Sequence, residues 1–301
     1  IGAENMTIHD AINEYLKQCE ARKLSWSTLK AYRCDLEILD RSQRHTELLD
    51  IESEELQKII KGNGSLKPAT MLRRSVSFHI FFQYCKEKGY IQETPVIKSQ
   101  RVKLQTPVTL TADKVTGIFR ELYSTPKEGK FYWEKSRNMA IVELLYATGM
   151  RISELCALKK DDIQFFDEFI IVSMHGNGKR ERKFLITNKQ VITALQTYQS
   201  DVDTASVDVV DSDAVFINRR GRAVSEQTVR YCLKNYNITP KILRNSAAKE
   251  MYDSGMNIFR LQGTLGLNSI DSAERFCCRQ ELENKRTYSL SDCDLRNRLS
   301  V

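Results

Sequence analysis

A short segment in the middle of the chain, Ala147-Thr-Gly-Met-Arg-Ile-Ser-Glu-Leu-Cys-Ala-Leu158, combines residue types that suit the binding of a phosphate. We expect one helix to end at Gly149 and a new one to begin with Arg151 at its mouth, because glycine commonly follows the last residue of a helix. The forked donors of an arginine and the N–H groups of a helix N-terminus then face the same anion. Glu154 follows three residues later on the same face of the first turn. Such a pair is either a surface ion pair or part of an anion site.

The cysteines suggest neither a metal centre nor a disulfide framework. They form no CxxC pair, and only four histidines accompany them. Free cysteine behaves as a small core residue, so we expect scattered buried thiols in a reducing cytosol. We therefore predict no metal. The eight cysteines are Cys19, Cys34, Cys85, Cys156, Cys232, Cys277, Cys278 and Cys293.

The elements that must position these residues begin with a helical region over residues 7–95. Apolar residues recur at helical spacing after Thr7 and again after Ser25, and both residue types are common N-caps. Residues 68–89 predict one long helix with Pro68 in its first turn and Gly89 after its last. Its aromatic face, formed by Phe78, Phe81 and Phe82, predicts the core of a helical bundle.

The second half of the chain predicts further helices around a small sheet. Pro95 and Pro107 flank a stretch with several basic residues, which indicates an interdomain linker at 96–108. Residues 111–122 and 133–147 predict helices, residues 169–174 and 182–186 predict a β-hairpin, and the chain is mostly helical from residue 189. We therefore predict a helical domain at 1–95, a basic linker at 96–108 and a larger domain at 109–301. The fold class is mainly α with a small antiparallel β-sheet.

Composition narrows the class of protein. Of 301 residues, 41% are hydrophobic, which excludes a disordered chain. No apolar run reaches the roughly 20 residues that cross a bilayer, and no leader peptide opens the sequence. We therefore expect a soluble cytoplasmic protein without a membrane partner. Lys and Arg outnumber Asp and Glu by 46 to 39, for a net charge of +7, which is compatible with a polyanionic partner.

Several motifs in order resemble the tyrosine recombinases, the phage integrase family. The segment at 147–158 is similar to the family's box I, and residues 68–95 resemble the last helix of its core-binding domain. Residues 215–222 resemble the strand and turn before box II, and Ile238-Thr-Pro-Lys-Ile-Leu-Arg-Asn245 resembles box II itself. The resemblance covers most of the chain. It implies a SAM-like helical core-binding domain followed by a recombinase catalytic domain.

The resemblance also implies a chemistry, the cleavage and rejoining of DNA through a phosphotyrosyl intermediate. In the family, two arginines and a His or Trp stabilise the phosphorane, a lysine protonates the leaving oxygen and a tyrosine attacks. Donors aimed at developing negative charge are usually the largest catalytic contribution. The covalent bond stores the energy for religation, so no cofactor is implied.

Carried over by position, the two arginines are Arg151 and Arg244, with Glu154 in support and Lys241 at the His/Lys position of box II. The usual hairpin lysine position holds Asn177. Lys179 stands two residues later, and whether it takes that role stays open.

Two departures from the family are sharper. Leu267 stands where the family has a His or Trp donor, and Phe276 stands where the family has the nucleophilic tyrosine. Phenylalanine has no hydroxyl to attack phosphorus. Phe276 is either an introduced trap or a natural loss, so whether the chain is an enzyme stays open.

Basic clusters fall in segments that the family uses on DNA. We expect these segments to form a two-domain clamp on duplex DNA with paired half-sites. The resemblance further implies self-association on DNA as a dimer or tetramer, with residues 280–301 working between subunits. The predicted DNA-binding residues are Arg73, Arg74, Lys98, Arg101, Lys103, Arg180, Arg182, Lys183, Arg219, Arg220 and Arg222.

Two functions of different class follow. The first is a recombinase or integrase of a mobile element, acting at the nucleoid. The second is an inactive recombinase-like subunit that occupies DNA sites and partners a second, active recombinase.

Overall fold

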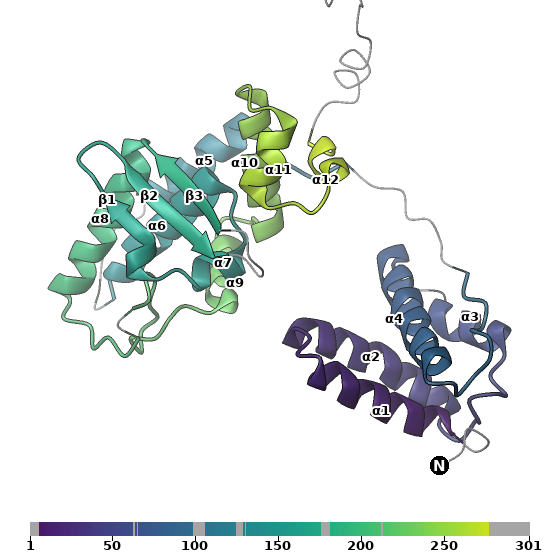
Figure 1. The fold of residues 1–301 in the computed structure, drawn as a ribbon. Helices are drawn as coiled ribbons and strands as arrows, with labels where there is room; N and C mark the ends of the chain where they lie inside the picture. The colour runs from purple at the N-terminus through teal and green to yellow at the C-terminus, as the bar shows by residue number, and fades with distance from the viewer. Residues whose placement is uncertain are drawn as a thin grey trace, which may run out of the picture. The chain divides into compact units, whose positions relative to one another are not determined.

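The computed structural model divides the chain into two compact units, residues 1–105 and 106–301 (Figure 1). It describes residues 6–62, 64, 66–98, 106–124, 129, 131–175, 181–211 and 213–276. The boundary between the units lies within the predicted linker 96–108, of which residues 99–105 fall outside the described residues.

The first unit is helical throughout its ordered elements. Its helices are α1 (Ile8–Ala21), α2 (Trp26–Gln43), α3 (Ser53–Lys61) and α4 (Pro68–Glu87). The side chain of Thr7 accepts the N–H of Asp10 at 3.2 Å and so caps α1. Ser25 caps α2 in the same way through the N–H of Thr28. These caps satisfy backbone donors that have no partner within the helix, so the two starts follow from local sequence.

The aromatic face of α4 forms the centre of this unit, as the spacing predicts. Phe78, Phe81 and Phe82 are completely buried. Tyr15 of α1 meets Phe81 edge to face, with 5.7 Å between the ring centroids. Aromatic pairs favour this geometry. The first unit therefore has its own hydrophobic core, built from α1, α2, α3 and α4.

The second unit combines helices with a small sheet. Its elements before the sheet are α5 (Ala112–Ser124), α6 (Trp133–Thr148), α7 (Ile152–Cys156) and the 3-10 turn η2 (Lys160–Asp162). The sheet consists of β1 (Ile163–Phe165), β2 (Ile170–His175) and β3 (Glu181–Ile186). Five helices follow among the described residues: α8 (Lys189–Thr204), α9 (Glu226–Lys234), α10 (Pro240–Asp253), α11 (Ile258–Leu265) and α12 (Ile270–Glu274).

The sheet is antiparallel, in the order β1-β2-β3. The predicted hairpin is present as β2 and β3, in a register that places Met174 opposite Arg182 and Ile170 opposite Ile186. The sequence did not predict β1, which is three residues long and too short for alternation to reveal. The predicted fold class, mainly α with a small antiparallel sheet, is confirmed.

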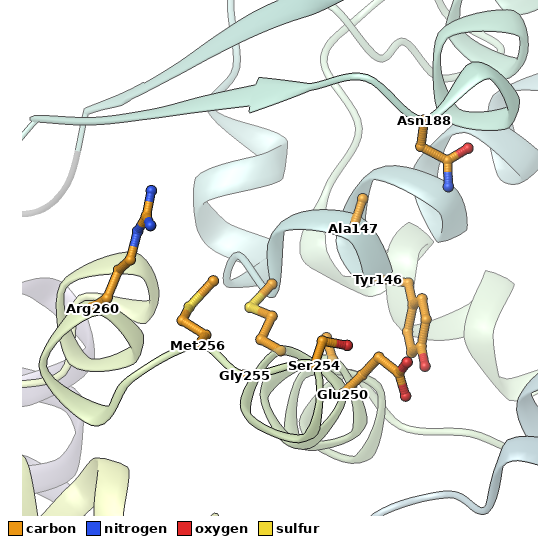
Figure 2. Close-up of a pocket in the computed structure, with 10 residues that line it drawn as sticks. Tyr146, Ala147, Asn188, Glu250, Ser254, Gly255, Met256 and Arg260 are labelled. Carbon is orange, nitrogen blue, oxygen red and sulfur yellow. The ribbon is translucent and has the colours of Figure 1, made fainter.

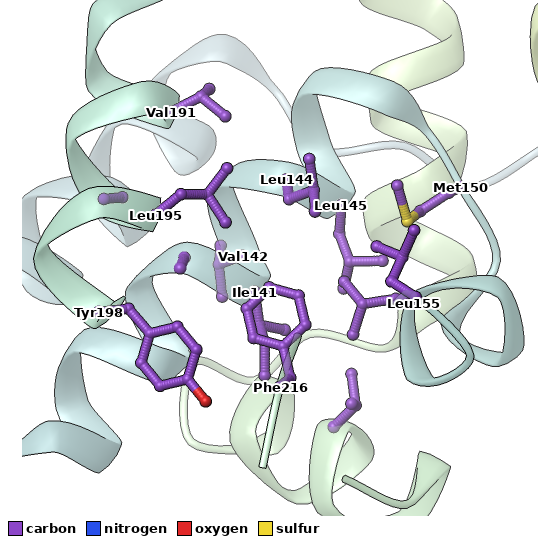
Figure 3. Packing of buried hydrophobic residues seen from close by; sticks show 14 of the residues in the cluster. Ile141, Val142, Leu144, Leu145, Met150, Leu155, Val191, Leu195, Tyr198 and Phe216 are labelled. Carbon is purple, nitrogen blue, oxygen red and sulfur yellow. The ribbon is translucent and has the colours of Figure 1, made fainter. Parts of the chain in front are cut away.

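The core of the second unit lies between the sheet and the helices α6 and α8. Ile170 and Val172 of β2 are completely buried, and they share one cluster with Ile141 of α6 and Leu195 of α8. Figure 3 shows Phe216 and Tyr198 within this cluster, where their rings stack with 5.5 Å between centroids. Helix α6 is therefore fixed on several sides, which holds the segment that follows it. Among the described helices, none is long and apolar enough to cross a membrane.

Candidate functional site

The junction between α6 and α7 carries the first predicted site residues. Gly149 ends α6 in the left-handed conformation, with φ of 61°, and Arg151 is the N-cap of α7. The backbone N–H of Arg151 donates to Glu154 Oε2 at 2.7 Å, and Arg151 Nη1 donates to Glu154 Oε1 at 3.1 Å. The sequence expectation for this turn, with Glu154 reaching back from the first turn of the helix, matches this geometry.

Arg244 reaches the same junction from α10. Its Nη1 donates to the carbonyl oxygen of Gly149 at 2.5 Å, and its Nη2 donates to the carbonyl oxygen of Leu265 at 2.7 Å. Burial and, to a smaller extent, the positive charge of Arg151 lower the pKa of Arg244 to about 10. Arg244 is therefore a cation held among other cations.

The end of α11 joins the two arginines. Arg151 Nη2 donates to the carbonyl oxygen of Gly266 at 3.0 Å, next in the chain to the Leu265 carbonyl that Arg244 holds. Gly266 closes α11 in the left-handed conformation, with φ of 60°. The structure therefore brings Arg151, Glu154 and Arg244 together in one place.

A third arginine, Arg182, also lies in this cluster. It is among the DNA-binding residues predicted from the sequence. Arg182 Nη1 donates to the carbonyl oxygen of Thr264 at 2.9 Å, and its Nη2 forms an ion pair with Glu154. Its side chain is only 11% exposed, so Arg182 lies within the arginine cluster and not on the outer face of the hairpin, and its role as a DNA contact stays a prediction. The signal was available, because Arg182, Phe184 and Ile186 alternate along β3 on the inner face.

Leu267 and Phe276 lie next to the cluster, in apolar surroundings. Both are half-buried and pack against a small core that contains Leu261 and Leu265 of α11 and Ala273 of α12. Leu267 follows directly on Gly266, whose carbonyl Arg151 holds. The two positions at which the chain departs from the family motif are thus in contact with one hydrophobic cluster.

Of the two lysines predicted for the site, the structure describes Lys241 and not Lys179. Lys241 is exposed in the first turn of α10, three residues before Arg244 and thus near it on one helix face. Lys179 lies outside the described residues. The asparagine that follows Arg244 in box II has a structural contact, because Asn245 Nδ2 donates to the carbonyl oxygen of Val108 at 3.1 Å.

The predicted DNA-binding residues of the first unit differ in exposure. Arg74 is buried, and its Nη1 donates to the carbonyl oxygen of Ile59 at 2.7 Å at the end of α3. The Arg74 guanidinium therefore satisfies the end of α3, and its role as a DNA contact stays a prediction. Arg73 is half-exposed and forms an ion pair with Asp35. Lys98 is exposed.

Of the predicted DNA-binding residues that the structure describes in the second unit, those at the surface lie on β3 and in one turn. Lys183 points to the outer face of β3. Arg219 pairs with Glu134 and lies over the ring of Phe131, 4.5 Å from its centroid. The turn also exposes Arg220 and Arg222. The predicted residues Arg101, Lys103 and Arg180, and the tail 280–301, lie outside the described part of the chain.

A separate pocket of about 620 Å³ opens beside α6, α10 and the start of α11 (Figure 2). Tyr146, Glu250, Met256 and Arg260 line it. It contains none of the predicted site residues. Within the described ranges, no group of three or more His, Cys, Asp and Glu side chains is placed to hold a metal ion.

Comparison with known proteins places the chain in a family. The profile of the phage integrase family matches residues 110–281, more than half of the chain. The chain belongs to the phage integrase family. A tyrosine recombinase of Agathobacter rectalis is 32% identical over 283 residues, which cover 89% of this chain and 90% of that protein.

Solved structures of integrase-family proteins share the fold. The XerH site-specific recombinase bound to a palindromic difH substrate superposes with a TM-score of 0.71 at 16% identity, covering 91% of this chain and 83% of that one. A lambda integrase tetramer bound to a Holliday junction gives a TM-score of 0.67 at 22% identity, covering 91% and 78%. At these identities the likeness shows the architecture alone.

Proposed function

We propose that this phage integrase family protein binds duplex DNA and holds one phosphodiester between Arg151 and Arg244, in site-specific recombination or DNA integration. The observation that carries the proposal is the convergence of the two guanidinium groups on the neighbouring carbonyls of Leu265 and Gly266. Forked guanidinium donors suit phosphate oxygens. Glu154 orients Arg151 through both its backbone and its side chain.

The same proposal includes assembly on paired half-sites. The XerH structure holds a palindromic substrate, and the lambda integrase structure is a tetramer on a junction. A palindromic site mirrors the two-fold symmetry of a protein dimer. We propose that this chain likewise occupies paired half-sites as a dimer or tetramer, with residues 280–301 acting between subunits.

The chain as given forms no covalent DNA adduct under this proposal, because position 276 holds phenylalanine. Arg151, Arg244, Lys241 and, from the hairpin, Lys179 are proposed to bind and polarise the phosphate without a nucleophile.

The second candidate is a partner subunit that occupies DNA without cutting and acts with an active recombinase. Its support is that Leu267 and Phe276 both pack against the same apolar cluster. An introduced trap would change the nucleophile alone, whereas here the His/Trp position has changed as well. The two losses together favour a natural, non-cleaving protein.

Titration of labelled duplex DNA tests the binding that both candidates share. Five to ten phosphate contacts predict a loss of affinity of about 10³–10⁵ between 50 and 200 mM salt. Arg151→Ala and Arg244→Ala should each weaken binding, whereas Arg230→Ala, a matched loss on the exposed face of α9, should not. A flat salt response, or equal affinity of all four proteins, would contradict the proposal.

A further inference from the structure

We infer that Arg182 is a positioning residue of the phosphate site, which holds Glu154 and the end of α11 so that Arg151 and Arg244 face one anion. This inference rests on the proposed function, because it concerns the same site.

Arg182 links helix α7 to helix α11 through two contacts. Its Nη2 pairs with Glu154 of α7 while its Nη1 donates to the Thr264 carbonyl of α11 at 2.9 Å. Both terminal nitrogens are engaged and the side chain is 11% exposed. Arg182 therefore acts through its partners and not as a donor at the surface. A planar guanidinium makes two such bonds in a fixed geometry, which an ammonium cannot do.

The carboxylate of Glu154 links Arg182 to Arg151. Glu154 Oε1 accepts from Arg151 at 3.1 Å and also pairs with Arg182, while Oε2 takes the backbone N–H of Arg151. Without Arg182, Glu154 would have Arg151 as its one arginine partner in this cluster. Its negative charge would then bear on Arg151 alone and compete with a bound anion for that guanidinium.

Three consecutive carbonyls at the end of α11 each receive one of the arginines. Arg182 holds Thr264, Arg244 holds Leu265 and Arg151 holds Gly266. The Arg182 guanidinium also lies against Gly266, where an added Cβ would come within 2.9 Å of Nη1. Arg182 thus fixes the segment on which both other arginines depend.

The placement of Arg182 depends on the register of the hairpin. Arg182 faces inward on β3 opposite Met174, and its neighbour Lys183 faces outward. Because side chains alternate along a strand, a slip of one residue would exchange the two. The inward position of Arg182 therefore depends on this register.

Phosphate binding by the full chain tests this assignment. Inorganic phosphate is titrated at matched ionic strength, with the thermal unfolding midpoint as the readout of binding. The proteins are the parent, Arg244→Gln, Arg182→Gln, Arg182→Lys, the exposed control Arg230→Gln on α9, Glu154→Gln and the double variant Arg182→Gln/Glu154→Gln. Arg182→Lys keeps the charge and provides a folded comparison if the glutamine variant does not fold.

We expect Arg182→Gln to raise the phosphate Kd about tenfold, the size of a 1.4 kcal/mol effect. Arg182→Lys should recover part of this loss, and Arg230→Gln should lie within about twofold of the parent. In the Glu154→Gln background, Arg182→Gln should raise the Kd clearly less than about tenfold, since one of its two partners is gone and the contact with the Thr264 carbonyl remains. A loss of full size there is not expected from a positioning role through Glu154 and would overturn it.

The failure of this inference differs from the failure of the proposed function. If the parent binds phosphate, Arg244→Gln weakens binding and Arg182→Gln binds as tightly as the parent, the role of Arg182 is refuted alone. If the parent and Arg244→Gln respond equally to phosphate, the site itself is wrong.

Discussion

Arg244 Nη1 donates to the carbonyl oxygen of Gly149 at 2.5 Å, which joins two residues that lie 95 positions apart in the chain. Gly149 is the residue at which α6 ends, and Arg244 lies in α10. This bond ties the two motifs that resemble box I and box II to each other. It also gives Arg244 a part in the fold besides its proposed part in binding.

Replacement of Arg244 should therefore affect stability as well as affinity. Arg244→Gln leaves the carbonyls of Gly149 and Leu265 without their donor. We expect the free energy of unfolding to fall by about 1–3 kcal/mol, measured by urea denaturation. Arg230→Gln, which loses an exposed ion pair on α9, should fall by no more than about 1 kcal/mol. Equal losses in the two variants would show that the Arg244 contacts contribute nothing.

Substitution by alanine should destabilise the protein more at Gly266 than at Gly255, another glycine with a positive φ. Gly266→Ala adds a Cβ within 2.9 Å of the Arg182 guanidinium at φ of 60°, whereas Gly255→Ala at φ of 93° meets nothing within 4 Å. Both carry the left-handed strain of about 1–2 kcal/mol, so their difference isolates the contact with Arg182. We expect Gly266→Ala to unfold at lower urea concentration and to bind DNA more weakly. A DNA affinity no lower than that of Gly255→Ala would contradict this reading of the contact.

Arg74 should matter for stability and not for DNA. Arg74→Met removes a charged donor from the carbonyls that end α3, and we expect a loss of about 1.5–3 kcal/mol in unfolding free energy. The DNA affinity of the folded protein should stay unchanged. Lys67→Met replaces an exposed residue at the N-cap of α4, the helix that contains Arg74, and provides the control for stability. A clear drop in affinity for Arg74→Met, at a temperature where it is fully folded, would support the sequence-based assignment.

The buried thiol of Cys232 should make the protein less stable at alkaline pH. Burial raises the pKa of Cys232 from 9.0 to about 12, so the unfolded state releases its proton first as the pH rises. The stability is thus fully present below pH 9 and is lost between pH 9 and about 12. Between pH 8 and 10, the parent should lose about 1.4 kcal/mol more than Cys232→Ala does, by urea denaturation at each pH. Cys34→Ala, which removes an exposed thiol, should follow the parent; an identical pH response of Cys232→Ala would count against the effect.

Restoring tyrosine at position 276 should recover little cleavage. Phe276→Tyr supplies the nucleophile, but Leu267 still leaves the phosphorane short of one donor, a deficit of about 10²–10³ in rate. The assay is covalent adduct formation on a nicked suicide substrate by the given chain, Phe276→Tyr and Phe276→Tyr/Leu267→His. We expect no adduct from the given chain, a trace from Phe276→Tyr and more from Phe276→Tyr/Leu267→His. Robust adduct from Phe276→Tyr alone would mean that Phe276 is the sole lesion and that the chain is otherwise an ordinary recombinase.

The helices of the first unit were predictable because their signals are local. Thr7 and Ser25 cap helices whose apolar spacing starts directly after them. Arg151 and Glu154 were predictable for the same reason, since they lie within one turn. The inward position of Arg182 was not predicted because the run of basic residues was interpreted as one surface, although strand alternation separates Arg182 from Lys183.

The carbonyl groups that accept hydrogen bonds from the arginines could not be predicted from the sequence. Arg182 and Thr264 are 82 positions apart, and Arg151 and Gly266 are 115 apart. Every residue has the same backbone carbonyl group, so no sequence pattern indicates which carbonyl a distant side chain will contact. Arg74 was missed on the same grounds, because its partners are the carbonyls of Ile59 and Ile60 in another helix.

The end of α11 also sets the local balance of charge. The C-terminus of a helix carries about half a negative elementary charge, and Glu154 adds a full one against the guanidinium groups of Arg151, Arg182 and Arg244. About one and a half positive charges remain on this count, more than the single negative charge of a phosphodiester neutralises. Under the proposed function, the cluster therefore favours a phosphate that gains further negative charge over a resting diester, and this preference does not depend on which residue stands at position 276.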